Sequence, residues 1–420
     1  MQITRNKDGY MQKRYGILVW FIATLFVVYA FCLNTASAVF STAIQSSLHA
    51  SNLGVSIAGG GFILGFALMQ IPAGYLLDKF NARFVVASGV FLLALGNLII
   101  SHADSLVIYT LSNLMQGIGA SFAFIAAAVL IAQWFSSANF PIMFGLTQTL
   151  SCILAGIIHY YFTLALTIYK WNDIYQVLSI FGFILLGLTL LFVTSPKDYQ
   201  RGPSISLRVS LGEVVSNKQI LLCSVTAATS FGVLLAYAGL WYIKVQAFYA
   251  VDNVSAVIIS GMMFLGVGIG TPLLGWISNL LKSRVMVIHF TLCLGAMALL
   301  MGIYLPHFNI NSLMTIKVIS FFIGFLLSGA MLLYTVVSEI STNATRGVAI
   351  SVTNTTVFLF NAALLFIPYF FVTHLSDKFF TYLWILPFFI IFSILLLYFV
   401  KDSLLPLGGP DKWGQRRKVV

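Results

Sequence analysis

The chain has 420 residues, of which 60% are hydrophobic and only 8% are charged. A water-soluble fold of this size needs far more charge to coat its surface, and solid apolar blocks without strict alternation exclude a β-barrel. The net charge of +11 would indicate nucleic-acid binding in a soluble protein, whereas in a membrane protein it is typical of basic residues retained on the cytoplasmic side. The composition therefore predicts an all-α, multi-pass integral membrane protein.

Twelve apolar runs, most of them long enough to cross a hydrocarbon core of about 30 Å, follow one another along the chain. The first six lie at about 15–46, 53–77, 84–101, 106–134, 140–165 and 173–194. The other six lie at about 219–244, 254–281, 285–305, 312–338, 345–373 and 379–400. The first run is too long for the apolar region of a signal peptide, so we interpret it as the first spanning helix.

The longest polar stretch, 195–218, separates the two sets of runs and is predicted to be a linker, with a short amphipathic helix over 211–218. We expect an N-terminal six-helix bundle over 1–194, a cytoplasmic linker over 195–218, a C-terminal six-helix bundle over 219–401 and a cytoplasmic tail over 402–420.

The basic residues are distributed unequally between the two ends of the predicted spans. With both termini inside, 18 of the 22 Lys and Arg residues fall on the cytoplasmic side, and the opposite side holds Lys170, Lys244, Lys317 and Lys378. Such asymmetry indicates an even number of spans with cytoplasmic N- and C-termini. We expect the protein in a bacterial inner (plasma) membrane.

A gap-free shift of about 201 positions brings the two halves of the sequence into register. The segment from Gly74 to Arg83, a small charged turn between apolar runs, matches the segment from Gly275 to Arg284. The shift also pairs Gly65 with Gly266. An internal repeat indicates a duplicated architecture, and two parallel halves joined by a linker are typical of rocker-type secondary transporters.

The first charged turn resembles the signature loop between the second and third helices of the major facilitator superfamily. The second turn resembles the degenerate partner of that loop, and 113–119 (Asn-Leu-Met-Gln-Gly-Ile-Gly) resembles the motif of the fourth helix. The resemblance covers essentially the whole chain and implies twelve transmembrane helices in two pseudo-symmetric six-helix halves. It is specific at superfamily level and says little about the substrate.

Two departures from the family pattern argue against drug efflux. Asn113 stands at the arginine position of the fourth-helix motif, which removes a cation often tied to proton handling in drug/proton antiporters. The fifth span has the sequence 151–156 (Ser-Cys-Ile-Leu-Ala-Gly) in place of the Gly-Pro signature of that group.

Asp78 lies at the C-terminal end of its helix, where the macrodipole disfavours a negative charge. The resemblance implies that its partner is the N-terminus of the eleventh helix, near 343–346, with Lys79 and Arg83 completing the cluster. We hypothesise that Asp78 latches the halves together on the cytoplasmic side when the cavity faces outward; the alternative is that it only anchors a turn. In the second copy Asn279 replaces the acid, so the matching latch, against the start of the fifth helix, is expected to be weaker. The predicted gating residues are Gly74, Asp78, Lys79, Arg83, Gly275, Arg284 and Arg346.

Polar side chains at helical spacing occur in several spans, where they are costly unless they face protein or a water-filled cavity. The resemblance implies that the first, fourth, seventh and tenth helices line a central path. Hydrogen bonding between helices is the alternative reading for each stripe, and an interfacial aromatic belt is the alternative for Tyr237 and Trp241. The predicted substrate-binding residues are Asn34, Ser37, Ser41, Asn113, Gln116, Gln148, Tyr237, Trp241, Ser328 and Asn354.

No Asp or Glu lies in the middle of a predicted span, although a buried carboxylate is the usual proton carrier in such transporters. Proton coupling would then depend on His159, on Glu339 at the cytoplasmic end of the tenth span, or on titratable groups of the substrate. A histidine that only hydrogen-bonds a neighbour is the alternative for His159. Lys244 and Lys317 near the outer mouth favour an anionic or zwitterionic solute, unless both only snorkel to the interface.

The leading hypothesis is a secondary active transporter of a small polar metabolite, an amino acid or organic anion, working by alternating access with proton-coupled uptake. The alternatives are an exporter of a metabolite or siderophore and a transporter-like solute sensor. An enzyme or a primary pump is disfavoured because neither a metal-ligand cluster nor a Gly-x-x-x-x-Gly-Lys-Ser/Thr phosphate loop is visible. No cofactor or metal is predicted. The expected partners are a small-molecule substrate, the lipid bilayer and a coupling proton, without nucleic acid, for a monomeric chain.

Overall fold

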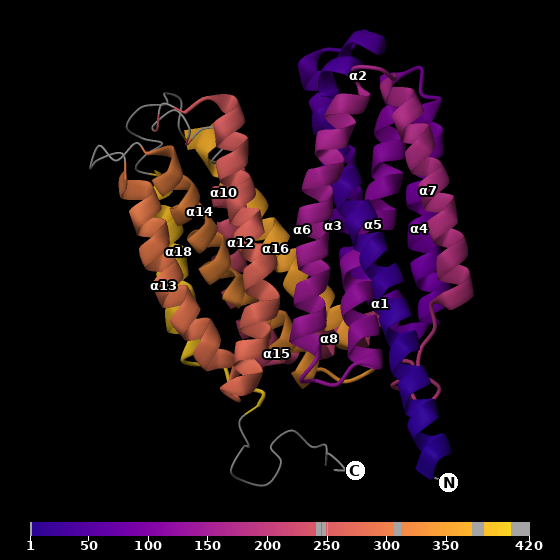
Figure 1. The fold of residues 1–420 in the computed structure, drawn as a ribbon, viewed down its shortest axis with the longest axis vertical. Helices are drawn as coiled ribbons and strands as arrows, with labels where there is room; N and C mark the ends of the chain where they lie inside the picture. Colours follow the sequence, from indigo (N-terminus) through magenta and orange to yellow (C-terminus); the bar gives the residue numbers. More distant parts are fainter. Residues whose placement is uncertain are drawn as a thin grey trace.

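The structure is a computed structural model that describes residues 2–240, 245, 249, 251–305, 312–371 and 382–404. Its helices form two groups that stand side by side (Figure 1). Helices suit this sequence because an apolar run in hydrocarbon must satisfy every backbone N–H and C=O within its own segment. The all-α prediction is confirmed.

The first group, here called the N-half, contains α1 to α7, with α5 packed against both α3 and α4 and with α1 packed on α5 and α6. The expected first span, 15–46, divides at Phe40 into α1 and α2, although Phe40 N–H still donates to Ala36 O (2.9 Å). Serine caps begin two of the helices: Ser51 Oγ accepts from Gly54 N (3.0 Å) before α3. The bounds are α1 Gln2–Val39, α2 Ser41–Ser47, α3 Asn52–Lys79, α4 Ala82–Ser101, α5 Leu106–Trp134, α6 Phe140–Ala165 and α7 Trp171–Phe192.

The second group, the C-half, repeats this plan, and two of its spans contain a turn that is not α-helical. The seventh span changes to a π-helical turn and the tenth to a 3₁₀ turn, irregularities that are frequent at functional sites and hinges. The bounds are α9 Lys218–Ala227, η1 Ala228–Gly232, α10 Val233–Leu240, α12 Asn253–Leu280, α13 Arg284–Tyr304, α14 Leu313–Leu327, η4 Ser328–Met331, α15 Leu332–Ile340, α16 Arg346–Phe371 and α18 Ile385–Leu397.

The segment between the halves lies across one end of the bundle and contacts both of them. Tyr75 OH, near the end of α3, donates to Ile205 O (3.2 Å), and Asn343 Nδ2, just before α16, donates to Gln200 O (3.0 Å). The short helix predicted here is present as α8 Leu207–Ser216, beginning four residues earlier than expected. We call this end of the bundle the linker face and the opposite end the far face.

Equivalent glycines bring equivalent helices together in the two halves. In the N-half, α5 approaches α3 so closely at Gly117 that a methyl group there would overlap Phe62 O. In the C-half, a methyl group at Gly324 on α14 would overlap Met263 O on α12. Small residues at helix interfaces in membranes allow the backbones to approach this closely. The duplication seen in the sequence is therefore a duplication of helix packing.

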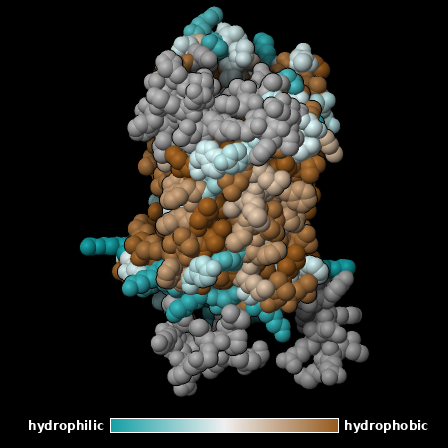
Figure 2. All heavy atoms as spheres, turned by 90° about the vertical axis from the view of Figure 1, so that its left-hand side faces the viewer, coloured by the Kyte–Doolittle hydropathy of each residue, from teal (hydrophilic) through white to brown (hydrophobic). Residues whose placement is uncertain are grey.

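Eleven helices in the described ranges are long and apolar enough to cross a membrane, and α18 is a shorter apolar helix. Figure 2 shows a broad apolar band on the face of the C-half, with hydrophilic side chains gathered at its two rims. The expected fold of twelve helices in two six-helix groups is confirmed in this arrangement.

Candidate functional site at the seam between the halves

The first seam between the halves joins α3 to α16, and Asp78 lies at its linker-face end. The Asp78 carboxylate accepts hydrogen bonds from Gly347 N (2.7 Å) and Val348 N (3.0 Å). Both N–H groups belong to the first turn of α16, where they have no partner inside the helix and where the helix dipole favours an anion. The contact predicted between Asp78 and the start of the eleventh helix is present.

The cations expected beside Asp78 have other partners. Lys79 Nζ donates to a tyrosine hydroxyl of its own helix (3.0 Å), and Arg83 Nε donates to Val193 O at the end of α7 (2.9 Å). Arg83 therefore ties the start of α4 to α7 within the N-half. Arg346, at the first position of α16, is instead the cation whose charge acts on the Asp78 carboxylate. The cluster therefore consists of one residue from each half, which sequence order alone does not reveal.

The second seam joins α12 of the C-half to α6 of the N-half and uses the opposite polarity. Asn279 Nδ2 donates to Ala138 O (2.6 Å), in the turn before α6. Further along, Thr149 Oγ1 makes a short hydrogen bond to Gly268 O. At the first seam a carboxylate accepts from backbone N–H groups, whereas here side chains donate to backbone carbonyls.

Glycines allow both seams to close. A methyl group at Gly74 would overlap Gly347 O and Ser351 Oγ across the first seam. At the second seam, a methyl group at Gly275 would come within 3.0 Å of the Pro141 backbone. Gly74 and Gly275, both predicted to be gating residues, therefore lie where the two halves approach each other closely.

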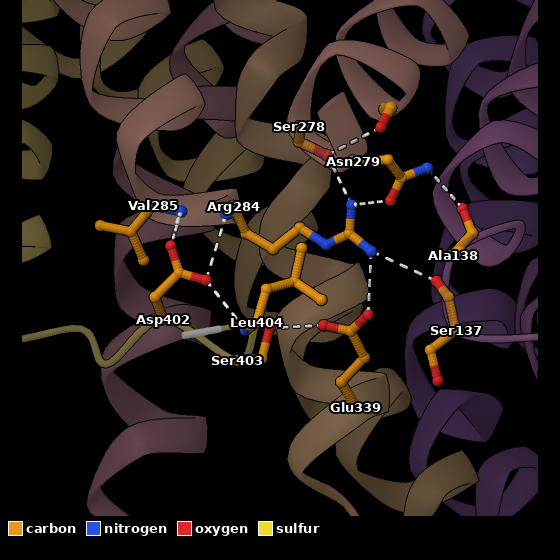
Figure 3. A network of polar contacts seen from close by, with 11 residues as sticks. Ser137, Ala138, Ser278, Asn279, Arg284, Val285, Glu339, Asp402, Ser403 and Leu404 are labelled. Atoms are coloured by element: carbon orange, nitrogen blue, oxygen red, sulfur yellow. Dashed lines mark hydrogen bonds and ion pairs between the residues drawn. The ribbon is translucent and has the colours of Figure 1, made fainter. Parts of the chain in front are cut away.

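Arg284 is fully buried at the linker face and connects the second seam to the interior of the C-half (Figure 3). Its Nη2 forms an ion pair with Glu339 Oε1 (3.0 Å) and donates to Ser137 O of the N-half (3.2 Å). Its Nη1 donates to Ser278 Oγ and Asn279 Oδ1 (both 2.6 Å). A buried charge is tolerated when it is paired and hydrogen-bonded in this way. Arg284 therefore makes polar contacts with residues of both halves.

The residues after the last helix complete this network, which the sequence analysis missed because it placed them in a tail. The Asp402 carboxylate accepts from Ser283 Oγ (2.5 Å) and Val285 N (3.0 Å), so it caps the N-terminus of α13. Ser403 Oγ makes a short hydrogen bond to Glu339 Oε2 (Figure 3). Glu339, predicted for ion coupling, thus has both carboxylate oxygens engaged at the linker face.

A buried polar contact crosses the first seam near the middle of the helices. Asn354 Nδ2 on α16 donates to Gln70 Oε1 on α3 (3.0 Å), and Tyr334 OH on α15 donates to Asn354 Oδ1 (2.9 Å). The rings of Phe66 and Phe358 meet one turn nearer the far face, with centroids 5.5 Å apart. Asn354 was predicted and Gln70 was not, although an amide within an apolar run carries the same signal.

Aromatic rings from the N-half pack around Tyr334. The ring centroids of Phe124 on α5 and Phe144 on α6 lie 5.7 and 5.8 Å from that of Tyr334. Such tilted and edge-on contacts are favourable beyond simple area burial. Together with Gln70 and Asn354 they form what we call the mid-seam cluster.

Among the predicted path residues of the N-half, Ser37 and Asn113 lie together between α1 and α5. Ser37 Oγ donates to Asn113 Oδ1 (3.1 Å) and accepts from Tyr109 OH (2.9 Å), while Asn113 Nδ2 donates to Tyr109 O (2.8 Å). Asn34, one turn before Ser37 on α1, is exposed. Ser41 is partly buried in α2.

Gln116 lies inside the N-half, away from both seams. Its Nε2 donates to Asn97 Oδ1 on α4 (2.8 Å), and Asn97 Nδ2 donates to Tyr29 OH (2.5 Å). These contacts correspond to helix–helix hydrogen bonding, the alternative considered from the sequence, while Gln116 Oε1 has no hydrogen-bond partner among the described residues.

Two predicted residues lie on α6. Gln148 Nε2 contacts Cys152 Sγ one turn away (3.3 Å), and His159 Nε2 lies 3.4 Å from Cys32 O on α1. His159 thus connects α6 to α1 within the N-half, and both side chains are partly buried.

In the C-half, Ser328 begins the 3₁₀ turn of the tenth span and donates to Phe325 O (2.7 Å). Tyr237 is fully buried on α10, and Lys317 is partly buried on α14. Trp241 and Lys244 lie outside the described residues.

A cavity of about 700 Å³ lies at the linker face between the turn before α6, the turn before α16 and the linker. Its charged lining residues are Arg201, Glu213, Glu339 and Arg346. Within the described residues, no three His, Cys, Asp or Glu side chains gather as metal ligands would.

Solved transporters share this architecture. A crystal structure of FucP in the outward conformation superimposes with a TM-score of 0.71 at 15% identity, covering 92% of this chain and 99% of FucP. The proton:xylose symporter XylE, bound to a halogenated glucose, gives 0.65 at 15% identity and covers 93% and 97% of the two chains. These identities establish likeness of fold.

Similar sequences include transporters with different named solutes. The "Probable galactarate/D-glucarate transporter GarP" of Escherichia coli K12 is 23% identical over 46% of each chain. The "Multidrug resistance protein MdtL" of Shewanella sp. ANA-3 is 21% identical over 52% of each chain. The chain therefore spans about half the length of the curated relatives it matches.

The sequence model of the Major Facilitator Superfamily matches residues 22–364, most of the chain. The duplicated halves, the two seams and this match agree, and the chain belongs to the Major Facilitator Superfamily.

Proposed function

We propose that the chain is a secondary active transporter that moves a small polar metabolite, an amino acid or organic anion, by alternating access with proton-coupled uptake. The observation that carries the proposal is the seam: two packing-equivalent halves touch through polar latches at the linker face and through the mid-seam cluster. Rocking of one half against the other around a site between them is how such duplicated transporters operate.

In this proposal the two moving bodies are residues 1–194 and 219–401, joined by the linker. The linker face is cytoplasmic, since 18 of the 22 basic residues belong to segments on that side. The protein then acts as a monomer in the bacterial inner membrane, with both termini in the cytoplasm.

The arrangement described above corresponds to a state closed at the linker face. The halves are joined there by the Asp78, Asn279 and Arg284 contacts, and their ribbons diverge toward the far face (Figure 1). The likeness to FucP in its outward conformation supports the same assignment. Opening to the cytoplasm would require all three contacts to break.

An organic anion is the favoured substrate class. GarP is named for the dicarboxylates galactarate and D-glucarate, and Lys317 places a cation on the tenth span near the far face. The path residues in this proposal are Asn34, Ser37, Ser41, Asn113, Gln116, Gln148, Tyr237, Trp241, Ser328 and Asn354. His159 and Glu339 are the proton-coupling candidates. XylE, a proton symporter with the same fold, supports proton coupling as a mechanism for this architecture.

Export is a second candidate because MdtL, named for multidrug resistance, matches about as much of the chain as GarP does. One assay distinguishes import from export. Purified protein in proteoliposomes is given labelled D-glucarate with and without an imposed pH gradient, acid on the far-face side. If the protein is a proton-coupled importer, D-glucarate should accumulate when the gradient is imposed, and a protonophore should abolish the accumulation. A wild-type protein that moves neither D-glucarate nor a wider panel of amino acids and organic acids would refute the proposal.

A further inference from the structure

The middle of the first seam contains a hydrogen-bond donor with no partner. Gln70 is only 1% exposed, and its Oε1 accepts from Asn354. Its Nε2 has no hydrogen-bond partner among the described residues. Leaving a buried amide N–H unpaired is unfavourable, and in native proteins such a group commonly marks a ligand, water or functional site.

The position of Gln70 along the helix places this donor near mid-membrane. Gln70 precedes Lys79, the last residue of α3, by nine residues, and Asn354 follows Arg346 by eight. At 1.5 Å per residue these distances are about 13 and 12 Å from the linker-face ends of the helices. A hydrocarbon core is about 30 Å thick, so the pair lies near its centre.

Aromatic rings lie near this donor in the first seam. Tyr334 donates to Asn354 and packs against the rings of Phe124 and Phe144, and Phe66 and Phe358 meet one turn from the amide pair on its far-face side. Ligand sites combine mostly apolar and aromatic walls with a few placed polar groups that fix orientation. The unpaired group of Gln70 is a donor, so it suits an acceptor oxygen.

We propose that Gln70 is a solute-recognition residue at the seam, whose Nε2 donates to a hydroxyl or carboxylate oxygen of the transported solute. Asn354 and Tyr334 hold the amide by fixing its Oε1. The proposal deepens the proposed function and rests on it. It predicts that Gln70 becomes accessible when the seam opens, and that it contributes to solute affinity.

A purely structural bridge between the halves is the competing explanation. Thr149 on α6 provides the comparison, because its Oγ1 hydrogen-bonds Gly268 O across the second seam and Gly145 O within α6. A bridge without a recognition role predicts the same kinetic effect for loss of either residue. A recognition role predicts an effect on KM at position 70 only.

The first arm of the test is independent of the solute. Single-cysteine variants Gln70→Cys, Ser351→Cys and Asn97→Cys are made in a background without the native cysteines, and each is exposed to a membrane-impermeant thiol reagent from either side. Asn97 is a buried amide inside the N-half and should stay unlabelled, whereas Ser351, at the seam near the linker face, should react when the halves separate. Labelling of Gln70→Cys supports the proposal. Labelling of Ser351→Cys without Gln70→Cys overturns it, and labelling of neither refutes alternating access itself.

The second arm measures uptake of D-glucarate and its monodeoxy analogues by wild type, Gln70→Met and Thr149→Val. Loss of one hydrogen bond should raise KM about tenfold in Gln70→Met. Where the contacted oxygen is a hydroxyl, the deoxy analogue that lacks it should show the same rise in KM with wild type and no further rise with Gln70→Met. Thr149→Val should alter the maximal rate with KM unchanged. Equal KM values for Gln70→Met and wild type would overturn the proposal. If wild type does not transport D-glucarate, a transported solute from the panel of amino acids and organic acids takes its place in this arm. If wild type transports none of them, the proposed function fails, and the labelling arm alone decides the place of Gln70.

Discussion

Replacing Asp78 with Asn should shift the protein away from the state closed at the linker face. The carboxylate accepts two hydrogen bonds from the first turn of α16, at 2.7 and 3.0 Å. An asparagine has one acceptor oxygen, so Asp78→Asn keeps at most one of these bonds and loses the charge that the helix N-terminus favours.

The free energy by which Asp78→Asn destabilises the closed state follows from these contacts. A hydrogen bond to a charged group contributes about 1.5–3 kcal/mol net, and the interaction with the helix terminus about 0.3–1 kcal/mol. Burial of the carboxylate in the closed state opposes part of this gain. We therefore expect the closed state to lose about 2 kcal/mol, which changes the ratio of closed to open protein roughly thirtyfold.

The assay is the distance distribution between spin labels placed on exposed linker-face positions of the two halves, together with proteoliposome uptake. Asp78→Asn should broaden the distribution toward longer distances and slow uptake. Asp173→Asn is the matched control, because Asp173 accepts from Lys170 N (3.1 Å) at the start of α7, inside the N-half. A distance distribution and uptake rate equal to those of the parent in Asp78→Asn would refute the latch.

The remaining predictions concern the other contacts at the seam and the coupling residue. Glu339→Ala should lower the melting temperature and the free energy of unfolding, the latter by about 3–5 kcal/mol, because it leaves the buried Arg284 without its ion-pair partner. The control Glu213→Ala, which changes an exposed residue, should melt like the parent. A melting temperature of Glu339→Ala equal to that of the parent would contradict the network. Gly74→Ala should reduce uptake at least tenfold, because its methyl group would overlap the backbone of α16, whereas Gly156→Ala, with open space at that position, should transport normally; normal uptake by Gly74→Ala would rule out tight closure here. Asn279→Asp should favour opening of the second seam, measured with labels on α6 and α12, because it removes the donor to Ala138 O; an unchanged distance would show that this hydrogen bond does not hold the second seam closed. His159→Ala should abolish the dependence of uptake on the pH gradient, and an unchanged pH profile would remove His159 from coupling.

Several features of this protein follow from its sequence alone. Apolar runs of spanning length force helices, because hydrocarbon leaves backbone groups no other partner. The repeat that pairs Gly74 with Gly275 predicts equivalent seams, and the placement of Asp78 against its own helix dipole predicts a partner elsewhere. These inferences need only local periodicity and charge.

Other features were decided by tertiary structure. Gln116 and Gln70 both look like amides in apolar helices, yet Gln116 bonds Asn97 inside the N-half and Gln70 faces the other half. Asp402 follows the last span and looks like part of a tail, yet it caps α13. The direction in which a side chain points depends on the rotation of its helix and on which neighbours pack against it. The contacts of Gln70 with Asn354 and of Asp402 with α13 join residues more than a hundred positions apart, so local sequence patterns do not contain them.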